Sequence, residues 1–260
     1  MKKRVFIVAG GPSLTDFDFS SLANEDTIVV NSSIFFVPRP KYFITMDYTW
    51  FLKNSICFGG DGGKRQSIYD ASTAEKFFVV SFSGDRRELS EHGVIDRKFN
   101  LEYDLRVVDR ILFASRQGGI GTAFSDFRCG EDSGYSALQL AILLGYEQIY
   151  LLGMDFSVLQ TEPKIRTIAG STLQLSSGSS VEAAPIQKID LSKQTHFFKK
   201  MDKSGTCEFT EKLHKYLRFY AEAFIEIGEK TKSKVFSCSS ISKLNDFIDY
   251  LPIEKVMENI

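Results

Sequence analysis

Cysteine is scarce and dispersed in this chain of 260 residues. Its four cysteines are far apart and form no Cys-x-x-Cys pair, which argues against a zinc site and, more strongly, against a disulfide framework. We therefore expect free thiols, as is usual for proteins in a reducing cytoplasm. These residues are Cys57, Cys129, Cys207 and Cys238.

Neither one sign of charge nor long hydrophobic runs are in excess. The formal net charge is −1 and no basic block is present, so nothing in the composition indicates a nucleic-acid-binding protein. No segment approaches the roughly 20 apolar residues of a membrane span, and the N-terminal apolar run of about six residues is too short for a signal peptide. We expect a cytoplasmic protein, and the sequence is compatible with a peripheral position at the inner face of the membrane and with a homo-oligomer.

Short apolar runs alternate with helical patterns along most of the chain, and the apolar fraction of 43% is enough for one large α/β domain. This alternation predicts an α/β fold with a Rossmann-like, mostly parallel sheet flanked by helices. The expected strands are 4–9, 27–30, 41–45, 77–82, 147–152 and 234–238. The expected helices are 134–144, 209–230 and 240–250.

One stretch interrupts this alternation. Residues 170–184 are rich in serine and glycine, and residues 157–193 show no clear period. Such a composition favours a mobile lid or an insertion. We therefore predict a main domain made of residues 1–156 and 205–260, with a lid insertion at 157–204.

A glycine loop directly follows the first expected strand. Gly10 and Gly11 end the apolar run, and Pro12 fixes one backbone angle straight after it. Glycines at this point let backbone N–H groups approach a ligand, because no Cβ blocks the way, but a tight turn alone would also require glycine. The loop is neither a Walker A loop nor a full Gly-x-Gly-x-x-Gly fingerprint.

Polar residues follow several other expected strands or open the helix at 134–144. Because the carboxyl ends of parallel strands meet at one edge, where such sheets bind ligands, these residues are candidates for a binding site. Each also has a structural alternative: Asn31 caps a turn, Asp132 and Ser133 cap the helix, and Asp155 anchors a loop. The candidates at this edge are Gly10, Gly11, Asn31, Asp47, Ser81, Ser133 and Asp155.

Histidine is also scarce, with three in the chain. His92 and His214 have the surroundings of surface residues, whereas His196 follows the expected lid. A histidine on a lid near a binding site can act as general base, since its pKa lies near neutral pH; the alternative is a half-buried side chain with a backbone partner. No cluster of His, Cys and carboxylate residues has metal-ligand spacing, so any metal would arrive with a substrate.

Three segments together resemble a known group. They are VAGGPSL, then SGYSALQLAILLGYEQIYLLGMDF, then VFSCSSISKLNDFI, and with their surroundings they span about half of the chain. This pattern is similar to that of the family 42 bacterial sialyltransferases, and to the related proteins grouped as domain of unknown function 115. That group includes flagellin glycosyltransferase domains and archaeal pterin pyrophosphokinases.

The resemblance implies a CMP-sugar donor bound at the sheet edge and metal-independent, inverting transfer to the hydroxyl of a surface glycan of lipo-oligosaccharide type. It assigns the proton-accepting base to His196. It assigns Gly10, Gly11 and Ser13 to the loop and the donor phosphate, and Asn31 and Ser32 to the binding of cytidine. Asp47 stands near the donor in this resemblance, and Ser133 and Gly134 match the family's residues at the helix start. From its place at a strand end, we add Asp155 as a candidate for a sugar hydroxyl.

The chain departs from the family at two points. Gly10 stands where the family has asparagine, and Ser157 stands where the family has a tyrosine that donates to the leaving phosphate. We expect Lys164 or Arg166 to supply that positive stabilisation instead. Two other functions stay open: a pyrophosphokinase-type transferase that uses ATP and Mg²⁺, and a nucleotide-binding protein with a degenerate site.

Overall fold

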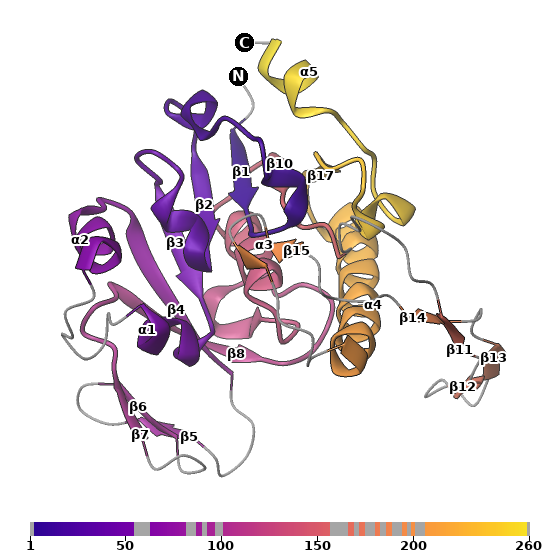
Figure 1. Ribbon diagram of the computed structural model, residues 1–260, viewed down its shortest axis with the longest axis horizontal. Helices are drawn as coiled ribbons and strands as arrows, with labels where there is room; N and C mark the ends of the chain where they lie inside the picture. The colour runs from indigo at the N-terminus through magenta and orange to yellow at the C-terminus, as the bar shows by residue number, and fades with distance from the viewer. Residues whose placement is uncertain are drawn as a thin grey trace.

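Figure 1 shows the protein as a computed structural model. The structure describes residues 3–54, 63–81, 87–89, 93–96, 101–156, 166–168, 172–174, 180–182, 186–188, 194–196, 199–200 and 206–258. Among these residues, no helix is both long enough and apolar enough to cross a membrane.

The centre of the molecule is an eight-stranded sheet in which every pair of neighbours is parallel. Its order is β17-β10-β1-β2-β3-β4-β8-β9. The strands are β1 (Arg4–Val8), β2 (Thr27–Val30), β3 (Tyr42–Thr45), β4 (Glu75–Ser81), β8 (Arg110–Ser115), β9 (Phe127–Arg128), β10 (Gln148–Leu152) and β17 (Lys234–Ser237). The sheet confirms the predicted α/β, Rossmann-like fold.

Strand β1 lies inside this sheet and is covered on both faces, which explains its continuous apolar sequence. Val5 and Ile7 belong to the core on one face. Phe6 and Val8 belong to the core on the other. All four side chains are fully buried. Because successive residues of a strand point to opposite faces, one apolar run supplies both cores.

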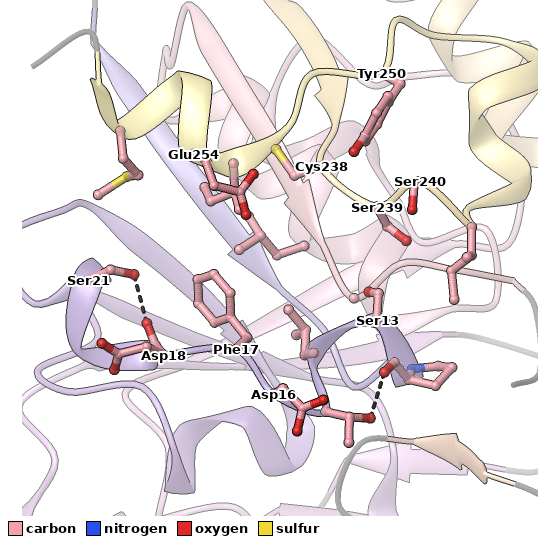
Figure 2. A pocket seen from close by; sticks show the side chains of 18 residues that line it. Ser13, Asp16, Phe17, Asp18, Ser21, Cys238, Ser239, Ser240, Tyr250 and Glu254 are labelled. Atoms are coloured by element: carbon pink, nitrogen blue, oxygen red, sulfur yellow. Dashed lines mark hydrogen bonds between the residues drawn. The ribbon is translucent and has the colours of Figure 1, made fainter.

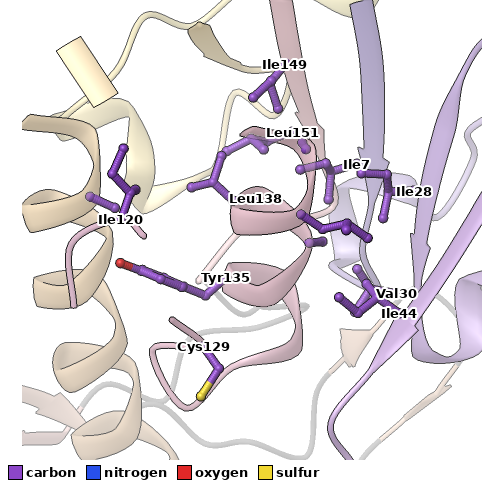
Figure 3. Close-up of a cluster of buried hydrophobic side chains, with 14 of the residues drawn as sticks. Ile7, Ile28, Val30, Ile44, Ile120, Cys129, Tyr135, Leu138, Ile149 and Leu151 are labelled. Carbon is purple, nitrogen blue, oxygen red and sulfur yellow. The ribbon is translucent and has the colours of Figure 1, made fainter. Parts of the chain in front are cut away.

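Helices α3 (Ser133–Leu143) and α4 (Thr206–Lys230) cover the first face. Figure 3 shows Ile7, Ile28 and Ile44 on the sheet packed toward α3. Nine residues of α3 are buried, so its sequence is apolar on most sides and not only along one stripe. Helix α4 shows the amphipathic pattern instead, with Phe219, Tyr220, Ala223 and Ile227 turned to the core.

The opposite face is covered by shorter elements. These are α1 (Tyr48–Lys53), α2 (Gly63–Ala71), α5 (Ile253–Glu258) and the 3-10 turns η1 (Pro12–Leu14), η2 (Phe19–Leu22) and η3 (Asn31–Phe35). Aromatic side chains fill much of this core. Trp50 of α1, for example, stacks on Phe35 with ring centroids 5.7 Å apart.

Within the described residues, four small antiparallel sheets accompany the large one. The first contains β5 (Arg87–Leu89), β6 (Gly93–Asp96) and β7 (Leu101–Asp104); the others pair β11 (Arg166–Ile168) with β14 (Ile186–Lys188), β12 (Thr172–Gln174) with β13 (Ser180–Glu182), and β15 (Gln194–His196) with β16 (Lys199–Lys200). The described strands between 166 and 200 pair only with one another, and β11 to β14 lie beyond α4 (Figure 1). The division at 157–204 remains a prediction.

The six expected strands are all present, within two residues at each end. The helices expected at 134–144 and 209–230 are α3 and α4. The helix expected at 240–250 is wrong: the chain there forms only a 3-10 turn, η6 (Lys243–Asp246), and α5 begins later. Side chains of this segment bind backbone groups in place of helical hydrogen bonds, as when Ser242 Oγ accepts from Leu244 N at 3.1 Å.

Candidate functional site

The order of the strands in the sheet changes direction at β1. From β1 the chain continues to β2, which pairs with one edge of β1, and the later strand β10 pairs with the other edge of β1. In open parallel sheets, the crevice at the carboxyl ends of two such strands is where ligands bind. Here the segments that enter this crevice are residues 9–13, after β1, and residues 153–156, after β10.

Gly11 has no room for a side chain. Its N–H donates to Gly153 O at 2.7 Å. A Cβ atom at Gly11 would lie 2.5 Å from that same oxygen and 2.7 Å from Asp155 Cγ, both below the 3.0 Å that real Cβ atoms keep. The sequence predicted that a ligand would come close to the backbone at Gly11. In the structure, the groups that come close there are Gly153 and Asp155 of the protein itself.

Asp155 holds the glycine loop in place. Its carboxylate is buried, with 2% of the residue exposed. Oδ2 accepts from Ser13 N at 2.7 Å, and Oδ1 accepts from the Ser13 hydroxyl at 2.8 Å. Of the two interpretations given for Asp155, the anchoring of a loop describes the observed contacts. Ser13 is consequently tied down by the same two bonds.

The ends of β2 and β3 are joined by side-chain hydrogen bonds. Asn31 has a left-handed backbone, with φ 52°, and its Oδ1 accepts from Thr45 Oγ1 at 2.6 Å. Thr45 Oγ1 in turn accepts from the Asp47 amide at 3.1 Å. Within the described residues, Asn31 Nδ2 makes no hydrogen bond, so this donor is available at the sheet edge. A non-glycine residue at positive φ is strained and is often found at functional sites.

Two further predicted residues have partners within the protein. The Ser32 hydroxyl accepts from Trp50 Nε1 at 3.0 Å. The Ser133 hydroxyl accepts from the Met46 amide at 3.1 Å, which fixes the N-terminus of α3 to the end of β3. Each hydroxyl keeps its own proton for donation. We call Asn31, Ser32, Thr45, Met46 and Ser133 the strand-end cluster.

Asp132 caps α3 from a partly buried position. Its Oδ2 accepts from Tyr135 N at 3.1 Å and from the Tyr220 hydroxyl at 2.7 Å. Burial raises the pKa of Asp132 above its ordinary value, although these hydrogen bonds lower it. The capping role foreseen for Asp132 is confirmed. Because the carboxylate already occupies the amides of the first turn, an anion would bind beside this helix end, at Ser133, and not on its axis.

Gly134 keeps α3 close to its neighbours. A Cβ atom there would lie 3.0 Å from Asp132 Oδ2, from Met154 Cε and from the Tyr220 hydroxyl. This contact is tighter than nearly all real Cβ contacts. Gly134 therefore serves close packing around Asp132 and the buried Tyr220.

The remaining candidates differ in where the backbone places them. Strand β15, which contains His196, lies against η1 of the glycine loop (Figure 1). Strand β11, which begins with Arg166, lies beyond α4 and away from this loop. Lys164 lies outside the described residues. The structure thus brings the strand of His196 to the predicted site, and it does not bring the strand of Arg166 there.

Arg116 is a cation at the sheet edge that the sequence reasoning missed. Its Nε donates to Ser81 Oγ, at the end of β4, at 3.4 Å. Its guanidinium lies 3.9 Å from Glu131, which makes a closer ion pair with Lys215 at 2.6 Å. Arg116 follows β8, a strand that was not expected; the signal available was its place just before Gly118 and Gly119.

A cavity of about 720 Å³ opens beside η1, on the sheet face opposite α3. One wall is the segment after β1, residues 12–18 with Ser21. The other wall comes from the C-terminal part of the chain, residues 238–241 with Tyr250, Ile253, Glu254 and Met257 (Figure 2). Leu152, the last residue of β10, and the following Gly153 complete the lining. We call this cavity the C-terminal pocket.

Cys129 and Cys238 are free thiols, as expected. Burial and the nearby Glu254 raise the pKa of Cys238 to about 12, so this thiol stays protonated at neutral pH. Within the described residues, no three His, Cys, Asp or Glu side chains form a group able to hold a metal ion.

Comparisons with known proteins find relatives only among solved structures. No family model matches the chain, and no curated protein matches it. The MAf glycosyltransferase from Magnetospirillum magneticum AMB-1 aligns with all of this chain, with a TM-score of 0.47 and 12% identity; the chain spans 36% of that longer protein.

The sialyltransferase CstII from Campylobacter jejuni, solved with the substrate analogue CMP-3FNeuAc, aligns over 97% of this chain and 87% of its own, with a TM-score of 0.46 and 16% identity. A structure of the sialyltransferase CST-II with a trisaccharide acceptor and CMP has a TM-score of 0.45 and 15% identity, over 96% of this chain and 86% of that one. At such identities the likeness concerns the course of the chain and assigns no activity.

Proposed function

We propose that this protein is a glycosyltransferase that moves a sialic-acid-like or other acidic sugar from a CMP-activated donor to a hydroxyl of a glycan. The observation that carries the proposal is the position of β15, the strand of His196, against η1 of the glycine loop. An expected general base and an expected donor loop, about 180 positions apart by their residue numbers, are thereby neighbours.

The donor is proposed to lie along the strand-end cluster. Asn31 Nδ2 and the Ser32 hydroxyl would donate to the cytidine, and the Ser133 hydroxyl would donate to the phosphate. Gly10 and Ser13 form the loop beside it. Gly11, Gly134 and Asp155 act in this proposal by holding the loop and α3 in place.

In the reaction, an acceptor hydroxyl attacks the anomeric carbon of the sugar from the side opposite the phosphate. The new C–O bond forms as the bond between that carbon and the phosphate oxygen breaks, which inverts the configuration. The proton of the hydroxyl goes to the imidazole of His196, and CMP leaves with the bonding electron pair. No metal ion takes part in this scheme.

Negative charge on the departing CMP needs a positive partner. Lys164 and Arg166 were the first candidates, but β11 lies beyond α4. Arg116 is the better candidate. Its ion pair with Glu131 is longer than that of Lys215, so donors of its guanidinium are available at the sheet edge. Asp47 is exposed at the end of β3, on the same edge, and would contact the acidic donor only through its backbone or a hydroxyl of the sugar.

An acceptor of lipo-oligosaccharide type would bring the enzyme to the inner face of the cytoplasmic membrane, with residues 157–204 on the acceptor side. The sugar donor and glycan are the proposed partners, and no further cofactor is needed.

Calorimetric titration with CMP, CTP, GTP and ATP–Mg²⁺, followed by a transfer assay with CMP-N-acetylneuraminic acid in the presence of EDTA, tests the function. We expect CMP to bind most tightly and the sugar to be released or transferred without metal. Exclusive binding of ATP–Mg²⁺ would instead indicate a pyrophosphokinase, and CMP binding without turnover of this or any other CMP-sugar would indicate a degenerate site.

A further inference from the structure

The C-terminal pocket is separate from the strand-end cluster. It lies on the other face of the sheet from α3, and none of the five cluster residues lines it. The pocket does share Pro12, Ser13 and Gly153 with the two segments that enter the crevice at the ends of β1 and β10. The pocket therefore needs an occupant of its own, and the chemistry of its walls indicates which.

The charges on its walls are negative. Asp16, Asp18 and Glu254 line it, and the described lining residues include no lysine, arginine or histidine. Hydrogen bonds from the Ser20 hydroxyl and amide hold the pKa of Asp18 below its ordinary value, so this carboxylate is ionised at neutral pH. These carboxylates repel a phosphate or carboxylate ligand, so the walls favour a neutral occupant over a second nucleotide.

Its polar groups are mostly hydroxyls, and one of them is buried without a partner. Ser239 is 3% exposed, and its Oγ has no hydrogen-bond partner. Buried polar groups in native proteins nearly always have one. Ser239 lies on the wall opposite the loop of Ser13 (Figure 2), so a ligand hydroxyl in the pocket could supply the missing bond.

Apolar surface completes the pocket. Phe17 comes from one wall and Tyr250 from the other (Figure 2), and Leu152 of β10 also lines the pocket. A sugar ring has hydroxyls at its rim and C–H groups on its faces, so it suits walls that combine hydroxyls, carboxylates and aromatic rings.

We infer that the C-terminal pocket binds a neutral, polyhydroxylated ligand, namely a sugar unit of a glycan. This inference rests on the proposed function in one respect: we take the glycan to be part of the acceptor. The sugar unit in the pocket would then lie at a distance from the acceptor hydroxyl that reacts. Sugar binding in the pocket can be measured without any transfer.

Saturation-transfer NMR with the full chain tests the inference, with maltotriose and N,N′-diacetylchitobiose as neutral probes and N-acetylneuraminic acid as the anionic one. Ile241→Trp would fill the pocket from a residue that is 36% exposed. Ile225→Trp is the matched control, since Ile225 on α4 is 64% exposed and does not line the pocket.

We expect a neutral probe to bind the unmodified protein, the acidic sugar not to bind, and Ile241→Trp to weaken neutral-probe binding by about tenfold or more while Ile225→Trp leaves it unchanged. Should Ile241→Trp fail to fold, Ser239→Ala removes only the hydroxyl and should weaken binding by at least about threefold. The inference would be overturned if neither of the two neutral probes bound the protein. It would also be overturned if the neutral probes bound equally to both tryptophan variants.

CMP titration of the same samples separates this inference from the proposed function. CMP affinity unchanged by Ile241→Trp supports two separate sites, whereas loss of CMP binding together with sugar binding would make the pocket part of the nucleotide site and overturn the inference. Sugar binding without any CMP binding would leave the pocket assigned and refute the proposed donor.

Discussion

Ser13 and Asp155, 142 positions apart in the chain, join the segments that follow β1 and β10, the two strands whose carboxyl ends form the crevice. Both the amide and the hydroxyl of Ser13 donate to the Asp155 carboxylate, at 2.7 and 2.8 Å. This pair holds the glycine loop on the carboxyl edge of the sheet. The candidate site therefore depends on a contact that no local sequence pattern contains.

Asp155→Ala should lower the free energy of unfolding by about 2 kcal/mol, because two hydrogen bonds to a buried charge are lost. Urea unfolding followed by circular dichroism measures this. Asp16→Asn, in the same loop, removes an exposed carboxylate and should change stability by less than about 0.5 kcal/mol. Equal effects of the two substitutions would mean that Asp155 does not anchor the loop.

Gly11→Ala should destabilise the protein by about 1–3 kcal/mol, because the new methyl group overlaps Gly153 O and the Asp155 carboxylate. Gly228→Ala is the control: a Cβ there meets nothing within 4 Å, and alanine in a helix interior should stabilise by about 0.5–1 kcal/mol. Thermal unfolding of both variants checks these opposite signs. A neutral Gly11→Ala would contradict the packing described for the loop.

The stability of the protein should depend on pH through Glu226. The hydrogen bond from Ile120 N holds the pKa of Glu226 below its ordinary value. A lowered pKa in the folded state contributes stability above the ordinary pKa, near 4.5, and this stability is lost as the pH falls through the folded-state pKa. Glu226→Gln should therefore be less stable than the unmodified protein at pH 7, and the difference should shrink toward pH 3.

Urea unfolding at both pH values measures that difference. Glu229→Gln, an exposed residue on the same helix, is the control and should show no such narrowing. A gap for Glu226→Gln that stays constant with pH would exclude the ionised carboxylate as its source.

His196→Ala should reduce kcat of sugar transfer by about 10²–10⁴-fold and leave the Kd of CMP unchanged, because only the proton transfer is lost. Activity of the unmodified enzyme should rise with pH through the pKa of the histidine, since the base must be neutral. His92→Ala is the matched control and should retain full activity. Loss of CMP binding in His196→Ala would give this residue a structural role.

The central strands could be predicted because they are buried on both faces. After Arg4, every residue of β1 is apolar and buried, and the same holds for the middle of β4. Strand β8 was missed since Arg110 and Phe113 are exposed and charged residues flank it, so its short apolar run resembles a loop.

The C-terminal segment shows where helical spacing is insufficient evidence. Residues 244, 247, 248 and 251 are apolar and spaced as in a helix. Ser242 Oγ, however, donates to Met154 O at 2.7 Å, and Asn245 Nδ2 donates to Ser239 O at 3.0 Å. These side-chain bonds give the backbone an alternative to the helix, and the bond to Met154 is a tertiary contact with the segment that follows β10.

The sequence indicates which edge of the sheet holds the candidate residues, but it does not indicate which of these residues bond to one another. Parallel-sheet topology correctly gathers residues that follow strands, such as Asn31 and Asp155, at one edge. Their hydrogen-bond partners, Thr45 and Ser13, required coordinates, because the geometry of strand ends is set by packing between distant segments. Arg116 was not among the candidates because β8, the strand that it follows, was not expected.

A crystal structure of the protein with CMP tests the proposed donor site. We expect a phosphate within about 3 Å of Ser133 Oγ, beside the loop from Gly10 to Ser13, with the base near Asn31 and Ser32. CMP bound in the C-terminal pocket, or at any place without contact to Ser13, Asn31 or Ser133, would contradict it.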